Sequence, residues 1–390
     1  MTLQAKLQQV FRNRFGREAQ LIVRAPGRVN LLGAHVDYNE GWVLPAATEQ
    51  AVWLAVGKGD DNAVRIKALD FDGEEASFSL DELPARDSDE AVSWVDYPRG
   101  VAWTLLNSGH DVAPIDAVFA GNVPIGAGVS SSAAVEVAFL AAWNSLGDLA
   151  LSGLQQAKLG QKTENQYIGL ASGIMDQFAS IHGCNGRLML LDCRTLAHEL
   201  VPLPENCAIL IADSGVRREL ATSEYNVRRS QCDEAVATLK AFLPGIRTLR
   251  DVSQEDFEMT AHHLPILLRR RAQHVIEECQ RVLQGADLLK RGDVAAFGRL
   301  IRRSHISARD LYEVSIPELD LLAATAWQVE GCYGARLTGA GFGGCIVVLA
   351  EAEAVDDVAA KLRQQYQAVY SRTPRIFTTK AADGVRVMTP

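Results

Sequence analysis

A glycine- and serine-rich segment near residue 125 constrains this chain more than any other feature. It follows an apolar stretch typical of a strand and precedes an alanine-rich stretch typical of a helix. Glycines let backbone amides approach an anion without an intervening Cβ, and the first turn of a helix presents unpaired N–H groups that bind phosphate. The segment therefore predicts a phosphate-binding loop. It reads Pro124-Ile125-Gly126-Ala127-Gly128-Val129-Ser130-Ser131-Ser132-Ala133-Ala134.

The same segment has a simpler interpretation, in which the glycines make a turn and one serine caps the helix. Serine is among the preferred capping residues. One cap needs only one hydroxyl, however, and three serines stand in a row at 130–132, which favours the phosphate loop. The loop is not a Walker A motif, because no Gly-Lys-Ser/Thr follows the glycines.

The length and composition predict a globular protein with two domains. A chain of 390 residues exceeds what one hydrophobic core usually supports, and 48% hydrophobic with 22% charged residues is ordinary for a globular protein. The net charge of −9 disfavours binding to nucleic acid or to an anionic membrane. No run of about 18 apolar residues predicts a membrane span. We therefore expect neither a nucleic-acid nor a membrane partner.

The seven cysteines favour a reducing compartment. They are odd in number and form no C-x-x-C pair, so a disulfide framework or a structural zinc site is not expected. The first 17 residues predict an amphipathic helix and lack the apolar block and cleavage site of a signal peptide. We therefore expect a cytoplasmic protein.

Strands and helices follow one another without strict alternation, which favours an α+β fold over a doubly wound sheet. A boundary in the Pro202–Pro204 region would give an N-terminal domain of 1–200 and a C-terminal domain of 201–390. The second half is predicted to be mostly helical up to about residue 328. The predicted strands lie at 19–24, 43–56, 64–70, 115–119, 188–191, 207–213 and 346–349.

Two further segments gather polar residues within single turns. Residues 27–39 hold arginine, histidine, aspartate and tyrosine after a predicted strand, and residues 173–178 place Asp176 in the first turn of a predicted helix. Isolated charges of this kind are commonly surface ion pairs or helix caps. Binding residues nevertheless favour loops at strand ends. The two segments read Gly27-Arg28-Val29-Asn30-Leu31-Leu32-Gly33-Ala34-His35-Val36-Asp37-Tyr38-Asn39 and Gly173-Ile174-Met175-Asp176-Gln177-Phe178.

Together and in this order, the three segments resemble the galactokinase branch of the GHMP small-molecule kinases. The likeness continues around Tyr225, at Ser304-His305 and in a second glycine-rich segment, residues 337–345, so it covers nearly the whole chain. The last segment contains a formal G-x-G-x-x-G but precedes a predicted strand, so we reject a dinucleotide site there. The resemblance implies a two-domain GHMP-kinase-like fold with the active site in the cleft between the domains.

The resemblance also implies the reaction, which is transfer of the γ-phosphate of ATP to the anomeric hydroxyl of a galactose-like monosaccharide. Asp176 would act as the general base on that hydroxyl, with Arg28 close to it and to the transferring phosphoryl group. Ser132 and Glu164 would hold Mg²⁺, a hard cation that prefers oxygen ligands. The ATP phosphates would lie on Gly126, Ala127, Gly128, Val129, Ser130, Ser131 and Ser132.

The substrate contacts follow from the same resemblance. Sugar-contacting positions of the family correspond to Ala34, His35, Asp37, Gly173 and Tyr225. Trp94 would stack near the adenine, although a core tryptophan fits the sequence equally well. We expect a monomer whose partners are the sugar and Mg·ATP.

One position departs from the family pattern. Galactokinases carry glutamate immediately before the motif histidine, where it accepts a hydrogen bond from the C6 hydroxyl, whereas this chain has Ala34. The exchange removes an acceptor and a negative charge beside C6, so a carboxylate at C6 becomes tolerable. We therefore hypothesise that galacturonate, or another galacto-configured sugar altered at C6, is preferred. Plain galactose stays open, because a water can replace one lost contact.

Two other functions stay open at this point. A non-catalytic sugar sensor with a kinase-like fold would be expected to have lost the serine loop or the arginine–aspartate pair, and both are present. A kinase for mevalonate or homoserine from the wider superfamily fits less well, because the His35-x-Asp37-Tyr38 cluster is intact.

Overall fold

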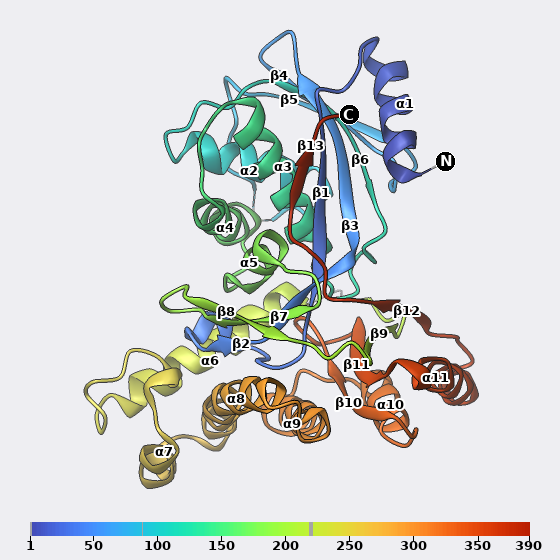
Figure 1. Ribbon diagram of the computed structural model, residues 1–390. Helices are drawn as coiled ribbons and strands as arrows, with labels where there is room; N and C mark the ends of the chain where they lie inside the picture. The colour runs from blue at the N-terminus through green and yellow to red at the C-terminus, as the bar shows by residue number, and fades with distance from the viewer. Residues whose placement is uncertain (1, 88, 218–220) are drawn as a thin grey trace.

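The computed structural model describes residues 2–87, 89–217 and 221–390, and their side chains except at 221–223. Two lobes, called here the upper and the lower lobe, lie one above the other in Figure 1. Each is built on its own sheet, and a small third sheet lies beside the lower lobe. The predicted α+β fold class is confirmed.

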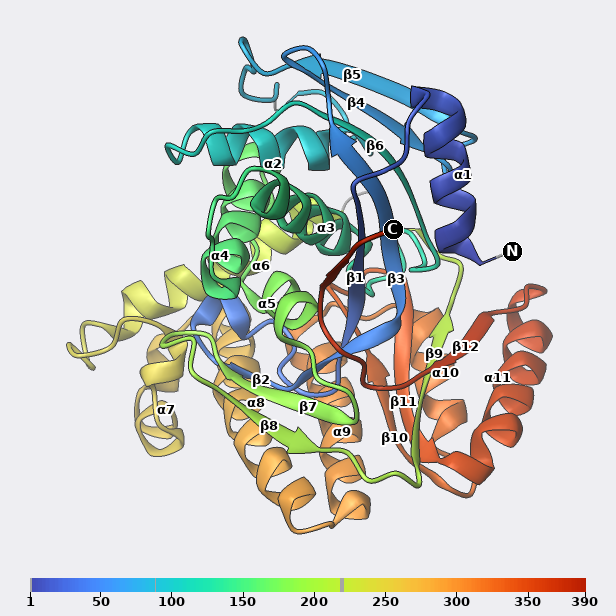
Figure 2. The same cartoon turned by 45° about the horizontal axis from the view of Figure 1, so that its top comes forward.

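The upper lobe holds a six-stranded sheet with helices on both faces. Helix α1 (Leu3–Phe15) packs on one face, where it buries Leu7 and Phe11, and α3 (Ser131–Leu146) packs on the other (Figure 2). Strands β1 (Leu21–Asn30) and β3 (Pro45–Lys58) are buried along most of their length because both faces of the sheet are covered. The strand order is β13 (Arg386–Met388), β1 (Leu21–Asn30), β3 (Pro45–Lys58), β6 (Ile115–Gly121), β4 (Ala63–Ala68) and β5 (Glu74–Ser79).

The remaining helices of the upper lobe bring polar residues toward its lower edge. Most residues of helix α3 are buried, so the helix lies inside the lobe, with the glycine–serine loop at its N-terminus. Around it lie α2 (Asp96–Leu106), α4 (Gly153–Lys162), the π-helical turn η2 (Thr163–Ile168) and α5 (Met175–His182).

The lower lobe combines an antiparallel four-stranded sheet with most of the C-terminal helices. Its sheet has the order β10 (Cys332–Leu337), β11 (Cys345–Glu351), β9 (Cys207–Asp213) and β12 (Arg375–Thr379). Its helices are α6 (Ala221–Leu239), α7 (Gln254–Thr260), α8 (Ile266–Lys290), α9 (Val294–Ser307), α10 (Pro317–Ala326) and α11 (Val355–Tyr370). Short helical turns are η1 (Asp37–Asn39), η3 (Leu249–Asp251), η4 (Ala261–His263), η5 (Ala308–Tyr312) and η6 (Ala352–Ala354).

The chain passes between the lobes more than once. The third sheet joins β2 (Trp42–Val43) to β7 (Arg187–Asp192) and β8 (His198–Pro202), and the C-terminal strand β13 pairs with β1 in the upper sheet. Residues on both sides of position 200 therefore contribute to the upper lobe, and the single boundary at 200 stays a prediction. Within the described ranges, no helix is both long and apolar enough to cross a membrane.

Candidate active site

A cavity of about 360 Å³ lies where the two lobes meet. Every predicted site residue lines it except Ala127 and Val129, whose side chains are buried in the core of the upper lobe. Residues that are far apart in the chain thus converge on one space, as the predicted cleft requires. The predicted residues that line the cavity are Arg28, Ala34, His35, Asp37, Trp94, Gly126, Gly128, Ser130, Ser131, Ser132, Glu164, Gly173, Asp176 and Tyr225.

The glycine–serine loop adopts a backbone that needs its glycines. Gly126 and Gly128 have φ of 68° and 86°, in the left-handed region that favours glycine. Ser130 stands at the N-cap position of α3, with φ of 59°, yet its hydroxyl makes no capping hydrogen bond. It donates instead to Asp176 Oδ2. The simpler interpretation, a serine cap, is therefore wrong for Ser130.

Arg28 and Asp176 form a two-pronged ion pair beside this loop. Arg28 Nε and Nη2 donate to Asp176 Oδ1 and Oδ2, each at 2.6 Å, while Arg28 Nη1 donates to the carbonyl of Gly128 at 2.7 Å. The arginine side chain is 5% exposed and the aspartate 23%. One guanidinium therefore joins the loop to the carboxylate and leaves that carboxylate open to the cavity.

A buried carboxylate lies close to this pair. Glu164 is on the π-helical turn η2, and π-helical turns are frequent at functional sites. Burial, and then the charge of Asp176, raise the pKa of Glu164 to about 7. Its Oε2 accepts from the hydroxyl of Ser172, and no lysine or arginine among the described residues forms an ion pair with it. Burial and a neighbouring carboxylate thus disfavour the ionised form of Glu164 near the glycine–serine loop, and a divalent cation bound beside it would restore that form.

Asp37 belongs to a tight turn packed against the backbone of another segment. It begins η1, two residues after His35, whose φ of 56° is in the left-handed region. A Cβ placed on Gly173 would lie 2.2 Å from Asp37 Oδ2, so only glycine allows this approach. Burial, and then the charge of Asp176, raise the pKa of Asp37 to about 6.

A directed chain of hydrogen bonds fixes His35. A carbonyl can only accept, so His35 Nε2 donates to the carbonyl of Ala340 at 3.0 Å, and Nδ1 accepts from the hydroxyl of Tyr38 at 2.9 Å. Tyr312 then donates to Tyr38 at 2.7 Å, and the thiol of Cys232 donates to Tyr312. Burial lowers the pKa of His35 to about 3, which matches a neutral ring. Both ring nitrogens are engaged, so a ligand would meet the carbon edge of this ring.

The wall at Ala34 is small and rigid. Ala34 is 3% exposed, and its N–H donates to Glu278 Oε1 at 3.2 Å, beside the N–H of Gly33 at 2.9 Å. The carbonyl of Ala34 accepts from His274 Nε2 at 3.0 Å. Two residues of α8 thus hold the backbone of residue 34 at its N–H and at its carbonyl.

The far end of the cavity is apolar and was largely missed from the sequence. Trp94 lies 5.9 Å from Phe71 between ring centroids at an angle of 28°, and its Nε1 donates to Glu74 Oε2 at 2.7 Å. The other side chains at this end carry no local signal, since the strands and helices that bear them look like any buried element. Lining residues that the sequence interpretation did not assign to the site include Val52, Asp70, Phe71, Tyr97, Phe119, Val123, Ile125, Val135 and Ser172.

Comparison with known proteins gives the family. The galactokinase galactose-binding signature matches residues 9–58, the GHMP kinases N-terminal domain matches 96–184 and the GHMP kinases C-terminal domain matches 286–368. The galactokinase of Roseiflexus sp. (strain RS-1) is 45% identical over 384 residues, which is 98% of this chain and 97% of that protein.

Solved structures agree. The crystal structure of Lactococcus lactis galactokinase complexed with galactose matches with a TM-score of 0.94 at 33% identity, covering 99% of this chain and 100% of that one. Methanococcus jannaschii mevalonate kinase matches with a TM-score of 0.63 at 17% identity, covering 94% and 100%, and shares the fold. The chain belongs to the galactokinase family of GHMP kinases, and it is therefore a sugar kinase that uses ATP.

Proposed function

We propose that this chain phosphorylates the C1 hydroxyl of a galactose-type sugar with Mg·ATP. The observation that carries the proposal is the ion pair of Arg28 with Asp176 beside the glycine–serine loop, with oxygen distances of 2.6 Å. The phosphates of ATP would lie along residues 126–132, and the sugar would lie between Asp176 and Asp37. A carboxylate that faces the cavity from the edge of a phosphate loop suits a hydroxyl that is to receive a phosphoryl group.

The reaction follows from this arrangement. The C1 oxygen attacks the γ-phosphorus, the bond from that phosphorus to the β–γ bridging oxygen breaks, and ADP leaves. The proton of the C1 hydroxyl passes to Asp176. Arg28 holds both carboxylate oxygens in place, and its charge would stabilise the transferring phosphoryl group. Phosphoryl transfer depends mainly on such positioning and charge neutralisation.

Ser132 and Glu164 would hold the Mg²⁺ ion. Mg²⁺ in kinases is usually bound by one or two protein oxygens together with substrate phosphates, rather than by an all-protein cage. In the described part of the chain, no three His, Cys, Asp or Glu side chains are grouped to hold a metal, which fits that mode. Bound there, Mg²⁺ would neutralise charge on the ATP phosphates.

The sugar would be recognised by Asp37 and its neighbours. Asp37 can accept two sugar hydroxyls, Gly173 gives the backbone a close approach, and Tyr225 offers a ring edge and a hydroxyl. The ring of His35 would contribute shape rather than a hydrogen bond, because Tyr38 and the carbonyl of Ala340 engage both of its nitrogens. Trp94 would contact the adenine.

A C6 carboxylate, as in galacturonate, is the proposed preference at Ala34. Behind this wall lies Arg336, which is 1% exposed, and its Nη1 makes no hydrogen bond within the described part of the chain. Its nearest carboxylate, Glu278, lies 3.6 Å away and also binds Arg281. Burial lowers the pKa of Arg336 to about 10, so the group keeps its charge at neutral pH. Behind the wall, Arg336 and Arg281 offset the charge of Glu278, and Ala34 itself carries no charge. An anionic substituent at C6 should therefore be tolerated better here than in a chain with glutamate at this position.

One assay tests the reaction and the preference together. ADP release is measured for purified protein with Mg·ATP and, in turn, galactose, galacturonate, N-acetylgalactosamine, arabinose or mevalonate. We expect turnover with galacto-configured sugars, loss of that turnover in excess EDTA, and a higher kcat/KM for galacturonate than for galactose. Turnover of mevalonate alone would contradict the proposed function.

The variant Ala34→Glu isolates the contribution of residue 34. It restores an acceptor and a negative charge at C6, so the ratio of galactose to galacturonate turnover should rise by roughly 10- to 100-fold. An unchanged ratio would remove residue 34 from sugar selection. Ala171→Glu, a substitution at a half-buried alanine that does not line the cavity, serves as the matched control.

A further inference from the structure

The turn that carries Asp37 is a partition between two cavities. The active-site cavity lies on one side, and a second cavity of about 240 Å³ lies on the other. Asp37 lines both, and Glu40 and Cys193 line the second one. Apart from its close contact with Gly173, Asp37 has space on both sides, so packing restrains its side chain only in part. The contacts at the base of the turn restrain it further.

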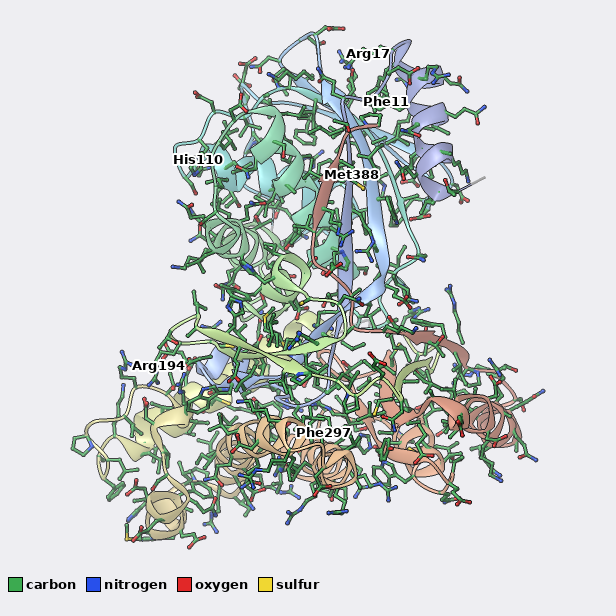
Figure 3. The ribbon with its side chains drawn as sticks, in the orientation of Figure 1. Phe11, Arg17, His110, Arg194, Phe297 and Met388 are labelled. Carbon is green, nitrogen blue, oxygen red and sulfur yellow. The ribbon has the colours of Figure 1, made fainter. Side chains whose placement is uncertain are left out.

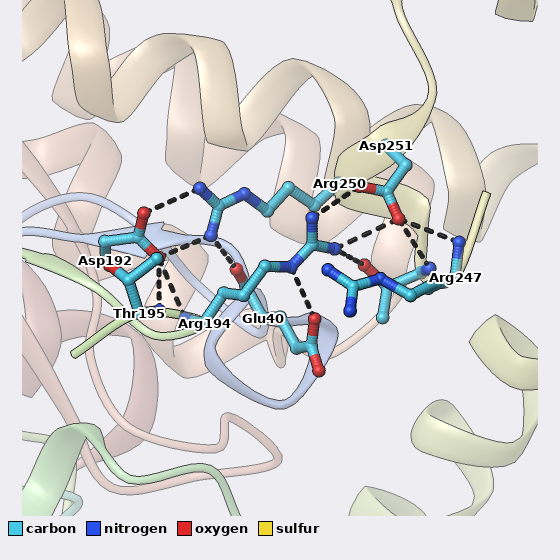
Figure 4. Close-up of polar contacts among 8 residues, drawn as sticks. Glu40, Asp192, Arg194, Thr195, Arg247, Arg250 and Asp251 are labelled. Atoms are coloured by element: carbon cyan, nitrogen blue, oxygen red, sulfur yellow. Dashed lines mark hydrogen bonds and ion pairs between the residues drawn. The ribbon is translucent and has the colours of Figure 1, made fainter. Parts of the chain in front are cut away.

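Arg250, from the distant turn η3, holds that base. Its Nη1 donates to the carbonyl of Glu40 at 2.6 Å, and its Nη2 donates to Asp192 Oδ2 at 2.7 Å (Figure 4). Its guanidinium carbon lies 3.6 Å from the centroid of the Trp42 ring. The side chain is 10% exposed, so these contacts are made mostly out of water. One arginine thus joins the end of the sugar turn to the β2–β7 pair.

Arg194 makes the second tie. Its Nε donates to Glu40 Oε2 at 2.6 Å, and its Nη1 and Nη2 donate to Asp251 at 2.6 and 3.0 Å (Figure 4). Asp251 also accepts from the backbone N–H of Arg247 at 2.8 Å. Hydrogen bonds from Arg194 hold the pKa of Asp251 well below its usual range. The second arginine therefore connects the same residue, Glu40, to Asp251, which follows Arg250 in η3.

Glu40 is the residue of this turn whose backbone most needs contacts from outside the turn. It closes η1 with φ of 57°, a left-handed conformation that is unfavourable for a residue with a Cβ, and its N–H donates to the carbonyl of Asp37 at 3.0 Å. Without contacts from Arg250 and Arg194, the turn would lower its free energy by relaxing the backbone at Glu40. Such a relaxation would shift Asp37, which is one hydrogen bond away.

We propose that Arg250, supported by Arg194, is a positioning residue that sets the location of Asp37 and thereby the affinity for the sugar. Neither arginine lines the active-site cavity, so each acts through Glu40. The inference rests on the proposed function, because it assigns Asp37 to the sugar. Loss of this restraint should change the affinity for the sugar and not that for ATP, since the proposed nucleotide residues belong to the upper lobe.

The test is the variant Arg250→Ala, assayed with the sugar that the wild-type chain phosphorylates best. Loss of a charged hydrogen bond to the Glu40 carbonyl should raise the KM for the sugar by roughly 10- to 100-fold and leave the KM for ATP within about twofold. Arg250→Lys should give an intermediate KM, because lysine keeps one contact but not the fork to Asp192. The rise in Tm that the sugar causes without ATP should shrink in the same order.

The matched control is Arg17→Ala in the upper lobe. Arg17 also binds a carboxylate, Asp116 at 2.6 Å, and a carbonyl, that of Lys58, and it lies over Phe11 (Figure 3). Its loss should lower Tm and leave both KM values unchanged. Equal rises in the two KM values of Arg250→Ala, or a sugar KM like that of Arg17→Ala, would overturn the proposal.

Two further outcomes are also decisive. If Arg250→Ala does not fold, a wild-type sugar KM in Arg250→Lys overturns the proposal, and a raised one supports it. If the wild-type chain turns over no sugar, the proposed function fails. The sugar-dependent shift in Tm of the arginine variants then still reports on binding, so the two failures are distinguishable.

Discussion

At the proposed nucleotide end of the cleft, the wall consists of apolar strand residues and one contiguous loop. At the proposed sugar end, polar side chains from distant segments bind one another. The loop at 126–132 needs little beyond its own glycines and the helix that follows it. The turn at Asp37, by contrast, depends on η3, on the β2–β7 pair and on Gly173. Away from the loop glycines and Arg28, the first end is therefore expected to tolerate substitution, whereas the second depends on single contacts between distant residues.

The largest loss of activity is expected at Asp176, where the two ends of the cleft meet. The variant Asp176→Asn keeps the shape but cannot accept the C1 proton, so kcat should fall by roughly 10²- to 10⁴-fold. Binding of ATP, measured by calorimetry, should stay near wild type, because the loop is intact. Asp310→Asn, which weakens an exposed fork with Arg309, is the control. A near-normal kcat in Asp176→Asn would exclude this residue from the chemistry.

A smaller effect is expected at Gly173, and it should change only the KM for the sugar. In Gly173→Ala the new Cβ would lie 2.2 Å from Asp37 Oδ2, so the carboxylate or the turn must move. Overpacking of this kind costs about 1–3 kcal/mol, which corresponds to a rise in sugar KM of roughly 5- to 150-fold. Steady-state assays should show an unchanged KM for ATP. Gly245→Ala, where no atom lies within 4 Å, should change neither value. Equal effects of the two substitutions would contradict the close approach.

Sugar binding is also expected to depend on pH, through the ionisation of Asp37. The pKa of Asp37 is about 6 in the folded chain, above its ordinary value of 3.8, because of burial and the charge of Asp176. The folded chain thus binds the proton of Asp37 more tightly than the unfolded chain does. The resulting contribution to the free energy of unfolding is lost as pH rises through about 6. The ionised form is the better acceptor for sugar hydroxyls. Sugar affinity should therefore rise roughly 10-fold between pH 5 and pH 7.

Calorimetric titration with sugar alone measures this effect without the titration of ATP. The variant Asp37→Asn should bind sugar weakly at every pH and lose the dependence. It should also raise Tm at pH 7.5 and not at pH 5, since it removes a buried charge only where that charge exists. A sugar affinity that is flat between pH 5 and pH 7 in the wild-type chain would contradict the assignment.

The sequence predicted the contiguous parts of the site better than the dispersed ones. The loop, the turn at 27–39 and the segment at 173–178 are readable because each concentrates glycine and polar residues within a few positions. Nothing local marks Arg250 or Arg194, because an arginine on a short turn looks like any surface charge until its partners are in place. The hydroxyl of Ser130 was likewise readable as a cap, and only the fold shows that it donates to Asp176.

The strand predictions show the same limit. Strands near 19–24, 115–119, 207–213 and 346–349 are present as β1, β6, β9 and β11, since their apolar runs are continuous. The predicted strand at 43–56 is divided between β2 and β3, which belong to different sheets. The pairing of β13 with β1 joins residues more than 350 positions apart. Long-range pairing of this kind depends on the whole fold rather than on local sequence.

The smallest change in KM is expected for a substitution at Trp94, at the proposed nucleotide end of the cleft. Its ring lies beside Phe71 and Phe119 and is partly exposed to the cavity, so Trp94→Ala should remove one of several apolar surfaces around the base. An aromatic contact contributes about 0.5–1.5 kcal/mol beyond its buried area, so the KM for ATP should rise roughly 2- to 12-fold while the KM for the sugar stays constant. Trp103→Ala, on α2 outside the cavity, is the control. If both variants lower Tm and neither changes the KM for ATP, Trp94 is a core residue and the nucleotide end is defined by its strands and loop alone.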